Sequence, residues 1–220
     1  MSRRFAVLLA SAVLSSGCVP VTEPVGDPTD PDKALVGTWV TADKVKNKAA
    51  FELTEEVKLK IEIAPEVKGN PKGLMLLTPV GYPFPGGKET VQVYFFVATV
   101  GTERYGNLIL DADDPLGIAR LDKEGAYARW SGGAGRRFLV FRYATAEDGL
   151  TLNFGDREAF EALMADEKIA RDDKRLASQI RDANWFGYKT PAGWVTKYLE
   201  KNGREKLFPL AKDVKYTKQK

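Results

Sequence analysis

The chain has 220 residues, of which 44% are apolar and 10% aromatic, and it contains no histidine. Its 33 basic and 30 acidic residues nearly balance, which argues against a nucleic-acid-binding protein and against an acidic disordered chain. The lack of histidine removes the commonest general base and the commonest metal ligand together. The sequence therefore predicts a protein that is not an enzyme and that uses no cofactor and no metal.

The first seventeen residues have the pattern of an export signal. Arg3 and Arg4 give a positive start, and residues 5–14 are apolar apart from one serine. Ten helical residues rise only about 15 Å, roughly half the hydrocarbon thickness of a bilayer, so this segment is too short for a permanent membrane anchor. We predict that residues 1–17 are a cleaved signal peptide. Its removal leaves 31 of the 33 basic residues, so the mature chain is almost neutral.

The end of this signal, Leu14-Ser15-Ser16-Gly17-Cys18, resembles the lipobox of bacterial lipoproteins. The resemblance implies that Cys18 becomes the first residue and carries diacylglyceryl and N-acyl groups such as palmitate. The family usually has leucine where this chain has Ser15. The alternative is an ordinary signal peptide cut nearby, with Cys18 as a free thiol. Cys18 is the only cysteine in the chain, and a lone thiol is a liability in an oxidising compartment, which favours the lipid.

Lipid on Cys18 would anchor the protein to a membrane of the cell envelope, because two or three acyl chains hold stably without a transmembrane helix. Val19 lacks the aspartate that resembles an inner-membrane retention signal, so we expect the outer membrane if the cell has one. Residues 18–33 contain four prolines and no periodic apolar pattern, which predicts a flexible tether. One domain is expected over residues 34–220.

Apolar and polar residues alternate over much of the first part of this domain, as in antiparallel strands with one buried face. About eight strands joined by turns can close on themselves and lose their exposed edges. We therefore predict a mainly β domain, an antiparallel meander barrel. The expected strands cover residues 35–40, 57–63, 73–78, 90–100, 105–110, 125–130, 137–143 and 150–154.

Helices are expected after the barrel. Asp156 is a suitable N-cap for a helix over residues 157–166, and Pro191 opens a second helix that ends at Gly203. Residues 176–188 fit either a further strand or an irregular cover. Nine basic and three acidic residues lie in 189–220. They indicate either contact with anionic lipid or, as we expect, a solvated helix face and a frayed tail.

Gly37-Thr38-Trp39 resembles the Gly-x-Trp signature that begins the barrel of lipocalins. The resemblance implies a lipocalin-like barrel in which Trp39 packs across the narrow end. In that family an arginine after the last strand stacks on the tryptophan, and Arg142 is the nearest candidate for it here. Much of the chain is also loosely similar to uncharacterised bacterial lipoproteins of lipocalin-like type, which have no activity to carry over.

A barrel of this kind can bind an apolar or amphipathic small molecule, for which a pocket of about 300 Å³ or more is needed. The candidate lining residues are aromatic: Trp39, Tyr94, Phe96, Phe141 and Tyr143. A small barrel can instead fill itself with side chains. The alternative is therefore an envelope structural or interaction module with no ligand.

One acidic loop deserves comparison with calcium sites. Asp111, Asp113 and Asp114 lie within four residues, and clustered carboxylates can bind Ca²⁺. The spacing of an EF-hand is missing, and aspartates are common in solvated turns. We expect a turn and no metal site there.

Overall fold

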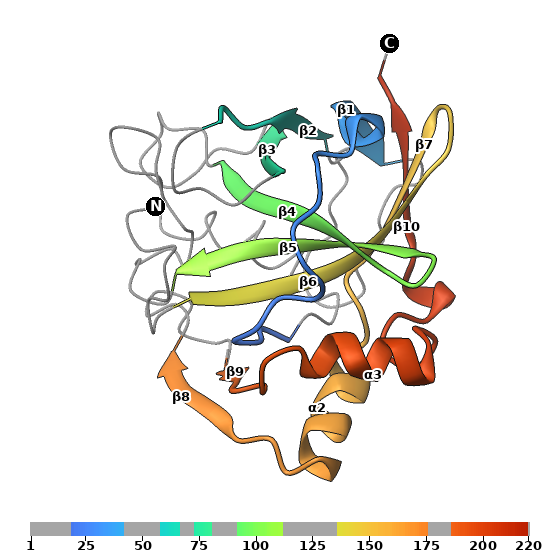
Figure 1. Cartoon of the computed structure of the whole chain (residues 1–220). Helices are drawn as coiled ribbons and strands as arrows, with labels where there is room; N and C mark the ends of the chain where they lie inside the picture. The colour runs from blue at the N-terminus through green and yellow to red at the C-terminus, as the bar shows by residue number, and fades with distance from the viewer. Residues whose placement is uncertain are drawn as a thin grey trace, which may run out of the picture.

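The structure is a computed structural model, and it describes residues 19–41, 58–66, 73–80, 92–111, 136–175 and 186–219 (Figure 1). Cys18, the strand expected over residues 125–130 and most of the acidic loop that starts at Asp111 lie outside these ranges. No helix in the described ranges is long and apolar enough to cross a bilayer.

Eight antiparallel strands form a closed barrel, in the order β1-β10-β7-β6-β5-β4-β3-β2. Strands β1 to β6 each pair with the next strand in sequence, and β10 closes the barrel between β7 and β1. The predicted antiparallel meander barrel is confirmed. The strands are β1 (Gly37–Thr41), β2 (Lys58–Ile63), β3 (Leu74–Val80), β4 (Val93–Val100), β5 (Glu103–Asp111), β6 (Arg136–Thr145), β7 (Gly149–Asn153) and β10 (Val214–Lys218).

The closing strand β10 lies where we predicted a frayed tail, so that prediction is wrong. Tyr216 is buried and lies opposite Leu150 of β7 and Thr41 of β1, while Lys215 and Thr217 are exposed. Only Val214 and Tyr216 face inward, and such a short alternation among lysines is hard to distinguish from a solvated tail. Helices are therefore not the last elements of the chain.

The chain between β7 and β10 forms a helical cover beside the barrel (Figure 1). It contains α2 (Arg157–Asp166), a small sheet of β8 (Arg171–Arg175) and β9 (Phe186–Tyr188), α3 (Trp194–Asn202) and the 3₁₀ turn η2 (Leu210–Lys212). The α2 prediction is confirmed together with its N-cap, since Asp156 Oδ1 accepts a hydrogen bond from the backbone N–H of Ala159 at 3.2 Å.

The second helix, α3, is shorter than predicted at its N-terminus. The backbone N–H of Trp194 donates to the carbonyl of Pro191, and Gly193 has a φ of 66°, so residues 191–193 form a turn. Gly203 ends the helix as expected, with a φ of 71° that favours glycine. Within the ambiguous stretch 176–188, residues 186–188 form the strand β9.

Alternation along the strands produces two separate apolar clusters. The interior cluster fills the barrel and draws its side chains from all eight strands and from Leu35. The outer cluster lies against the outside of β3, β4, β5 and β6. It is covered by α2, α3 and residues 19–25, which contribute their own buried side chains. The β-sheet is therefore apolar on both faces over half of the barrel.

Residues 19–32, which we call the strap, cross the outside of β6, β5 and β4 (Figure 1). Val21 exchanges two backbone hydrogen bonds with Phe138, at 3.0 and 2.8 Å, and the N–H of Thr29 donates to the carbonyl of Val97 at 2.9 Å. Val21 and Val25 are 0% exposed. These contacts contradict the flexible tether that the four prolines indicated, because apolar side chains between the prolines bury against the barrel wall.

Asn107 holds the middle of the strap. It lies on the outer face of β5 and is 0% exposed. Its side-chain oxygen accepts from the N–H of Val25 at 2.8 Å, and its side-chain nitrogen donates to the carbonyl of Val25 at 3.0 Å. Buried backbone groups need hydrogen-bond partners. The Asn107 side-chain amide therefore provides the hydrogen-bond donor and acceptor that the backbone of a neighbouring strand would otherwise provide to Val25.

Replacing Asn107 by alanine should detach the centre of the strap. The Asn107→Ala variant would lose two hydrogen bonds and leave both backbone groups of Val25 buried without a partner, so we expect unfolding to require about 2–4 kcal/mol less. Urea denaturation measures this change. Asn202→Ala is the matched control, because the Asn202 side chain donates to the carbonyl of Tyr198 on an exposed surface. Equal losses in the two variants would contradict the role given to Asn107.

Candidate functional site

The barrel interior is the first candidate site, and the described side chains fill it. Every member of the interior cluster is 9% exposed or less. The Phe141 ring packs against Phe95 and Phe154, with ring centroids 5.7 and 5.5 Å apart. It also lies directly over Gly106, where an added Cβ would come within 2.0 Å of the ring. Such packing leaves little apolar surface for a ligand among these residues.

The five aromatic residues predicted to line a ligand pocket divide between the two clusters. Trp39, Phe141 and Tyr143 belong to the interior cluster. Tyr94 and Phe96 belong to the outer cluster, since Phe95 between them faces inward and side chains alternate along a strand. Tyr94 and Phe96 therefore do not line the interior. Both faces of β4 are buried, so its continuous run of apolar residues does not indicate from sequence which side chains point into the barrel.

Trp39 is fully buried in the interior cluster. Its indole N–H donates to the carbonyl of Leu35 at 2.7 Å, in the 3₁₀ turn η1 (Lys33–Leu35). The Lys218 ammonium lies 5.3 Å from the centre of the Trp39 ring, which is cation–π geometry. The cation beside Trp39 is therefore Lys218, at the end of β10, and not Arg142. Arg142 instead forms an ion pair with Glu103.

A polar network ties the end of the strap to the barrel. Asp32 Oδ2 accepts hydrogen bonds from the Arg104 guanidinium at 2.6 Å and from the Tyr143 hydroxyl at 3.1 Å. Arg104 also donates to Thr145 and lies 5.3 Å from the centre of the Tyr143 ring. Burial, reinforced by the Asp32 carboxylate, raises the pKa of Tyr143. The Tyr143 hydroxyl is thus held as a neutral donor to Asp32.

A second network joins the C-terminal segment to the barrel. Glu103 accepts from Arg142 at 2.6 Å and from Arg204 at 3.0 Å. Arg142 also lies 3.8 Å from Asp213, which accepts from Asn153 at 2.6 Å. Burial opposes the charge on Glu103, but the hydrogen bonds and charges of the two arginines outweigh it and lower the pKa of Glu103. This network connects the β4–β5 turn, β6, the residues after α3 and the start of β10.

The chemistry of both networks is structural. Asp32 and Glu103 are engaged by arginine, and each network contains donors matched to acceptors. Among the residues that the structure describes, no group of three or more His, Cys, Asp or Glu side chains is placed to bind a metal ion. The acidic loop after Asp111 lies outside the described residues.

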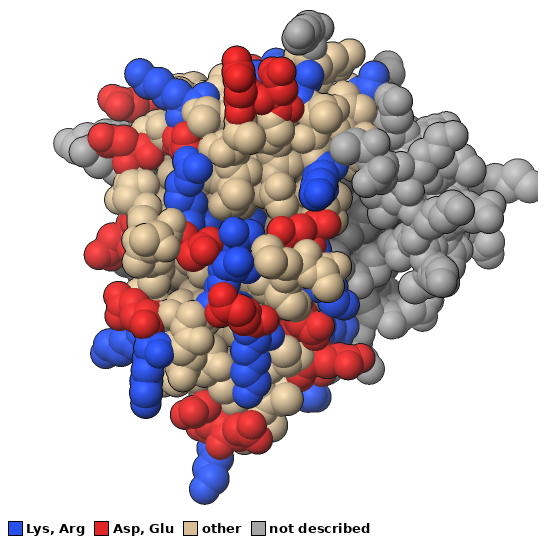
Figure 2. All heavy atoms as spheres, turned by 90° about the vertical axis from the view of Figure 1, so that its right-hand side faces the viewer, with Lys and Arg blue, Asp and Glu red and all other residues tan. Residues whose placement is uncertain are grey.

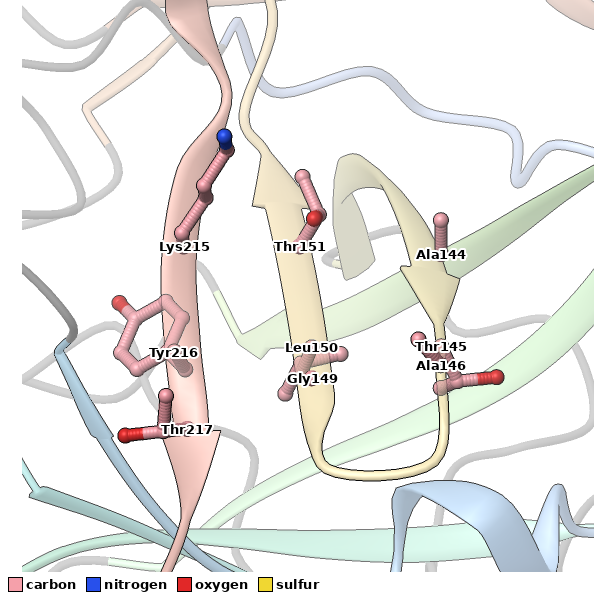
Figure 3. Close-up of a pocket in the computed structure, with 9 residues that line it drawn as sticks. All are labelled: Ala144, Thr145, Ala146, Gly149, Leu150, Thr151, Lys215, Tyr216 and Thr217. Carbon is pink, nitrogen blue, oxygen red and sulfur yellow. The ribbon is translucent and has the colours of Figure 1, made fainter.

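A groove lies where β6, β7 and β10 run side by side (Figure 3). Its volume is about 310 Å³. Its lining draws on both faces of the sheet: Ala144 and Thr151 point away from the interior cluster, whereas Leu150 and Tyr216 belong to that cluster. It is lined by Ala144, Thr145, Ala146, Gly149, Leu150, Thr151, Lys215, Tyr216 and Thr217.

Charge on this side of the molecule is mixed. Figure 2 shows basic and acidic side chains interspersed among uncharged ones over the described part of the face. Arg204 pairs with Glu103, and the Lys212 ammonium lies 3.7 Å from the Asp156 carboxylate. The basic residues of the C-terminal stretch are therefore partly balanced by acids from elsewhere in the chain, as expected for a solvated surface.

The fold defines the class of protein: a mainly β chain with an eight-stranded antiparallel meander barrel, consistent with a lipocalin-like architecture, and with two α-helices in its described part. Comparisons of the chain with protein families, curated proteins and solved structures found no match.

Glu103 should make the stability of the protein depend on pH in acid. The folded state lowers the pKa of Glu103 below its ordinary value of 4.5. Its carboxylate therefore stabilises the fold above that pH and ceases to do so as the pH falls through the folded-state pKa. Glu103→Gln should lower the free energy of unfolding by about 1–3 kcal/mol at neutral pH. The difference from the unmodified protein should vanish in acid.

Denaturation at a series of pH values measures this dependence. Glu147→Gln in the exposed β6–β7 turn is the control, with little effect expected at any pH. A loss in Glu103→Gln that persists unchanged in acid would show that the ion pairs with Arg142 and Arg204 are not its cause.

Proposed function

We propose that the protein is a non-enzymatic lipoprotein of the bacterial cell envelope, anchored through lipid on Cys18, whose filled barrel acts as a structural or interaction module through its outer surface. The observation that carries the choice of module is the packed interior, where Phe141 occupies the space beside Gly106. A barrel that binds an apolar small molecule needs an open apolar pocket. The described groove of suitable volume lies at β6, β7 and β10, and none of the five aromatic residues predicted to line a ligand pocket borders it.

The envelope location rests on the sequence before residue 19. A positive start, a short apolar segment and a single cysteine after small residues occur together only once in the chain. Acyl chains on Cys18 would retain the protein at a membrane, the outer membrane where the cell has one. The remainder of the chain then works outside the cytoplasm, where its lack of any second cysteine avoids unwanted disulfides.

The absence of catalysis is also part of the proposal. With no histidine in the chain, a general base near neutral pH would need a carboxylate or lysine with a displaced pKa. Within the described ranges, the carboxylate whose pKa departs clearly from its ordinary value is Glu103. Its pKa is lowered, which favours the ionised form, and it is bound to two arginines. These features support a structural or interaction role over a catalytic one.

Replacing Cys18 tests the anchor. Cys18→Ser should move the protein from the membrane fraction to the soluble fraction and abolish its labelling by a fatty-acid probe. Ser15→Leu is the matched control: it restores the usual lipobox leucine and should leave both properties intact. Unchanged membrane association of Cys18→Ser would show that lipid on this residue is not the anchor.

Native mass spectrometry of the extracted protein tests the filled barrel. We expect no bound small molecule in the unmodified protein and no fluorescence enhancement of an apolar naphthylamine probe. Phe141→Ala is the positive control, because it should lose about 3–5 kcal/mol of stability and open a cavity that takes up a small aromatic molecule such as benzene. A ligand that copurifies with the unmodified protein would restore the small-molecule carrier as the better function.

A further inference from the structure

No flexible linker separates the predicted lipid on Cys18 from the part of the chain that packs on the barrel. Cys18 precedes Val19 directly, and Val19 is 5% exposed in the outer cluster. The carbonyl of Pro20 accepts from the N–H of Tyr188 at 2.9 Å, and Val21 pairs with Phe138. One extended residue spans at most about 3.6 Å. A lipid on Cys18 would therefore sit within a residue of a fixed point on the domain surface.

We propose that the barrel is held against the bilayer by one fixed face, which includes the start of the strap, β8 and β9, and which we call the anchor face. This inference rests on the proposed lipid on Cys18. The partner is the phospholipid bilayer into which that lipid inserts. A flexible tether would allow the domain to turn any face toward the headgroups, whereas a strap paired from residue 20 onward allows only the surface beside that residue.

Two exposed cations lie on the anchor face. Arg171 is opposite Tyr188 in the pairing of β8 with β9, and Lys189 follows Tyr188 and donates its backbone N–H to the carbonyl of Ala170 at 3.0 Å. Tyr188, which pairs with Arg171 and precedes Lys189, donates its backbone N–H to the carbonyl of Pro20, so both cations lie near the start of the strap. Cationic side chains close to a membrane surface attract the phosphate groups of the lipid headgroups. They would add a polar contact to the hydrophobic insertion of the acyl chains.

The opposite wall of the barrel provides an internal reference. In the strand order of the closed barrel, β2 is four strands away from β6 in either direction. Lys60 lies on β2, is exposed, and pairs with Glu62 on the same strand. Figure 1 likewise places β2 and β9 on opposite sides of the barrel. A probe at position 60 should therefore point away from the membrane when the anchor face contacts it.

Site-specific quenching in vesicles tests the proposal. Acylated Cys18 has no free thiol, so a cysteine at Lys189→Cys or Lys60→Cys is the only site for a thiol-reactive fluorophore. The full lipoprotein would be reconstituted into vesicles of phosphatidylethanolamine and phosphatidylglycerol that contain a nitroxide-labelled lipid. We expect quenching at position 189 to be several-fold stronger than at position 60.

A spacer variant distinguishes fixed docking from simple proximity. A flexible insert of about twelve residues between Cys18 and Val19 reaches roughly 20 Å on average and should reduce quenching at position 189 toward the value at position 60. Equal quenching at the two positions in the protein without the insert would overturn the proposal, as would stronger quenching at position 60. If the lipid itself is absent, the protein fails to float with the vesicles and neither position is quenched, which identifies failure of the proposed function instead.

Discussion

Backbone pairing between the strap and the barrel wall is the interaction on which the remaining features depend. A chain segment rich in proline has few N–H groups to offer, and those of Val21 and Val25 are bonded to Phe138 and Asn107. This pairing buries the outer faces of β4, β5 and β6. It also places η1 against Trp39, and Asp32 against Arg104 and Tyr143. It fixes where the chain leaves the domain toward Cys18.

The filled interior and the covered outer wall have the same origin in side-chain alternation. Phe95 and Phe141 point inward and pack together, while their neighbours Phe96 and Phe138 point outward and pack together beneath the cover. A strand with two apolar faces must be covered on both. In this protein one cover is the barrel itself and the other is built from the strap, α2 and α3. Stability and fixed orientation thus come from the same contacts.

The sequence predicts best where a pattern is local and periodic. The α2 boundaries, the alternation in β2 and the burial of Trp39 followed from spacing, capping and a short signature. The strap and β10 could not be predicted in this way. Their apolar residues are few, and these residues become buried only because strands distant in the sequence lie beside them. Val25 and Asn107 are 82 positions apart, and the sequence around neither residue indicates that they form hydrogen bonds with each other. The side of the wall on which Tyr94 and Phe96 lie likewise depends on register with β3 and β5.

Amide hydrogen exchange of the mature protein tests the central claim, that the strap is part of the folded domain, most directly. The amides of Val21, Val25 and Thr29, which are bonded to the barrel and its Asn107 side chain, should exchange as slowly as those of the barrel strands that they cover. Exchange of these three amides at the rate of an unstructured peptide, with the barrel strands protected, would contradict the account.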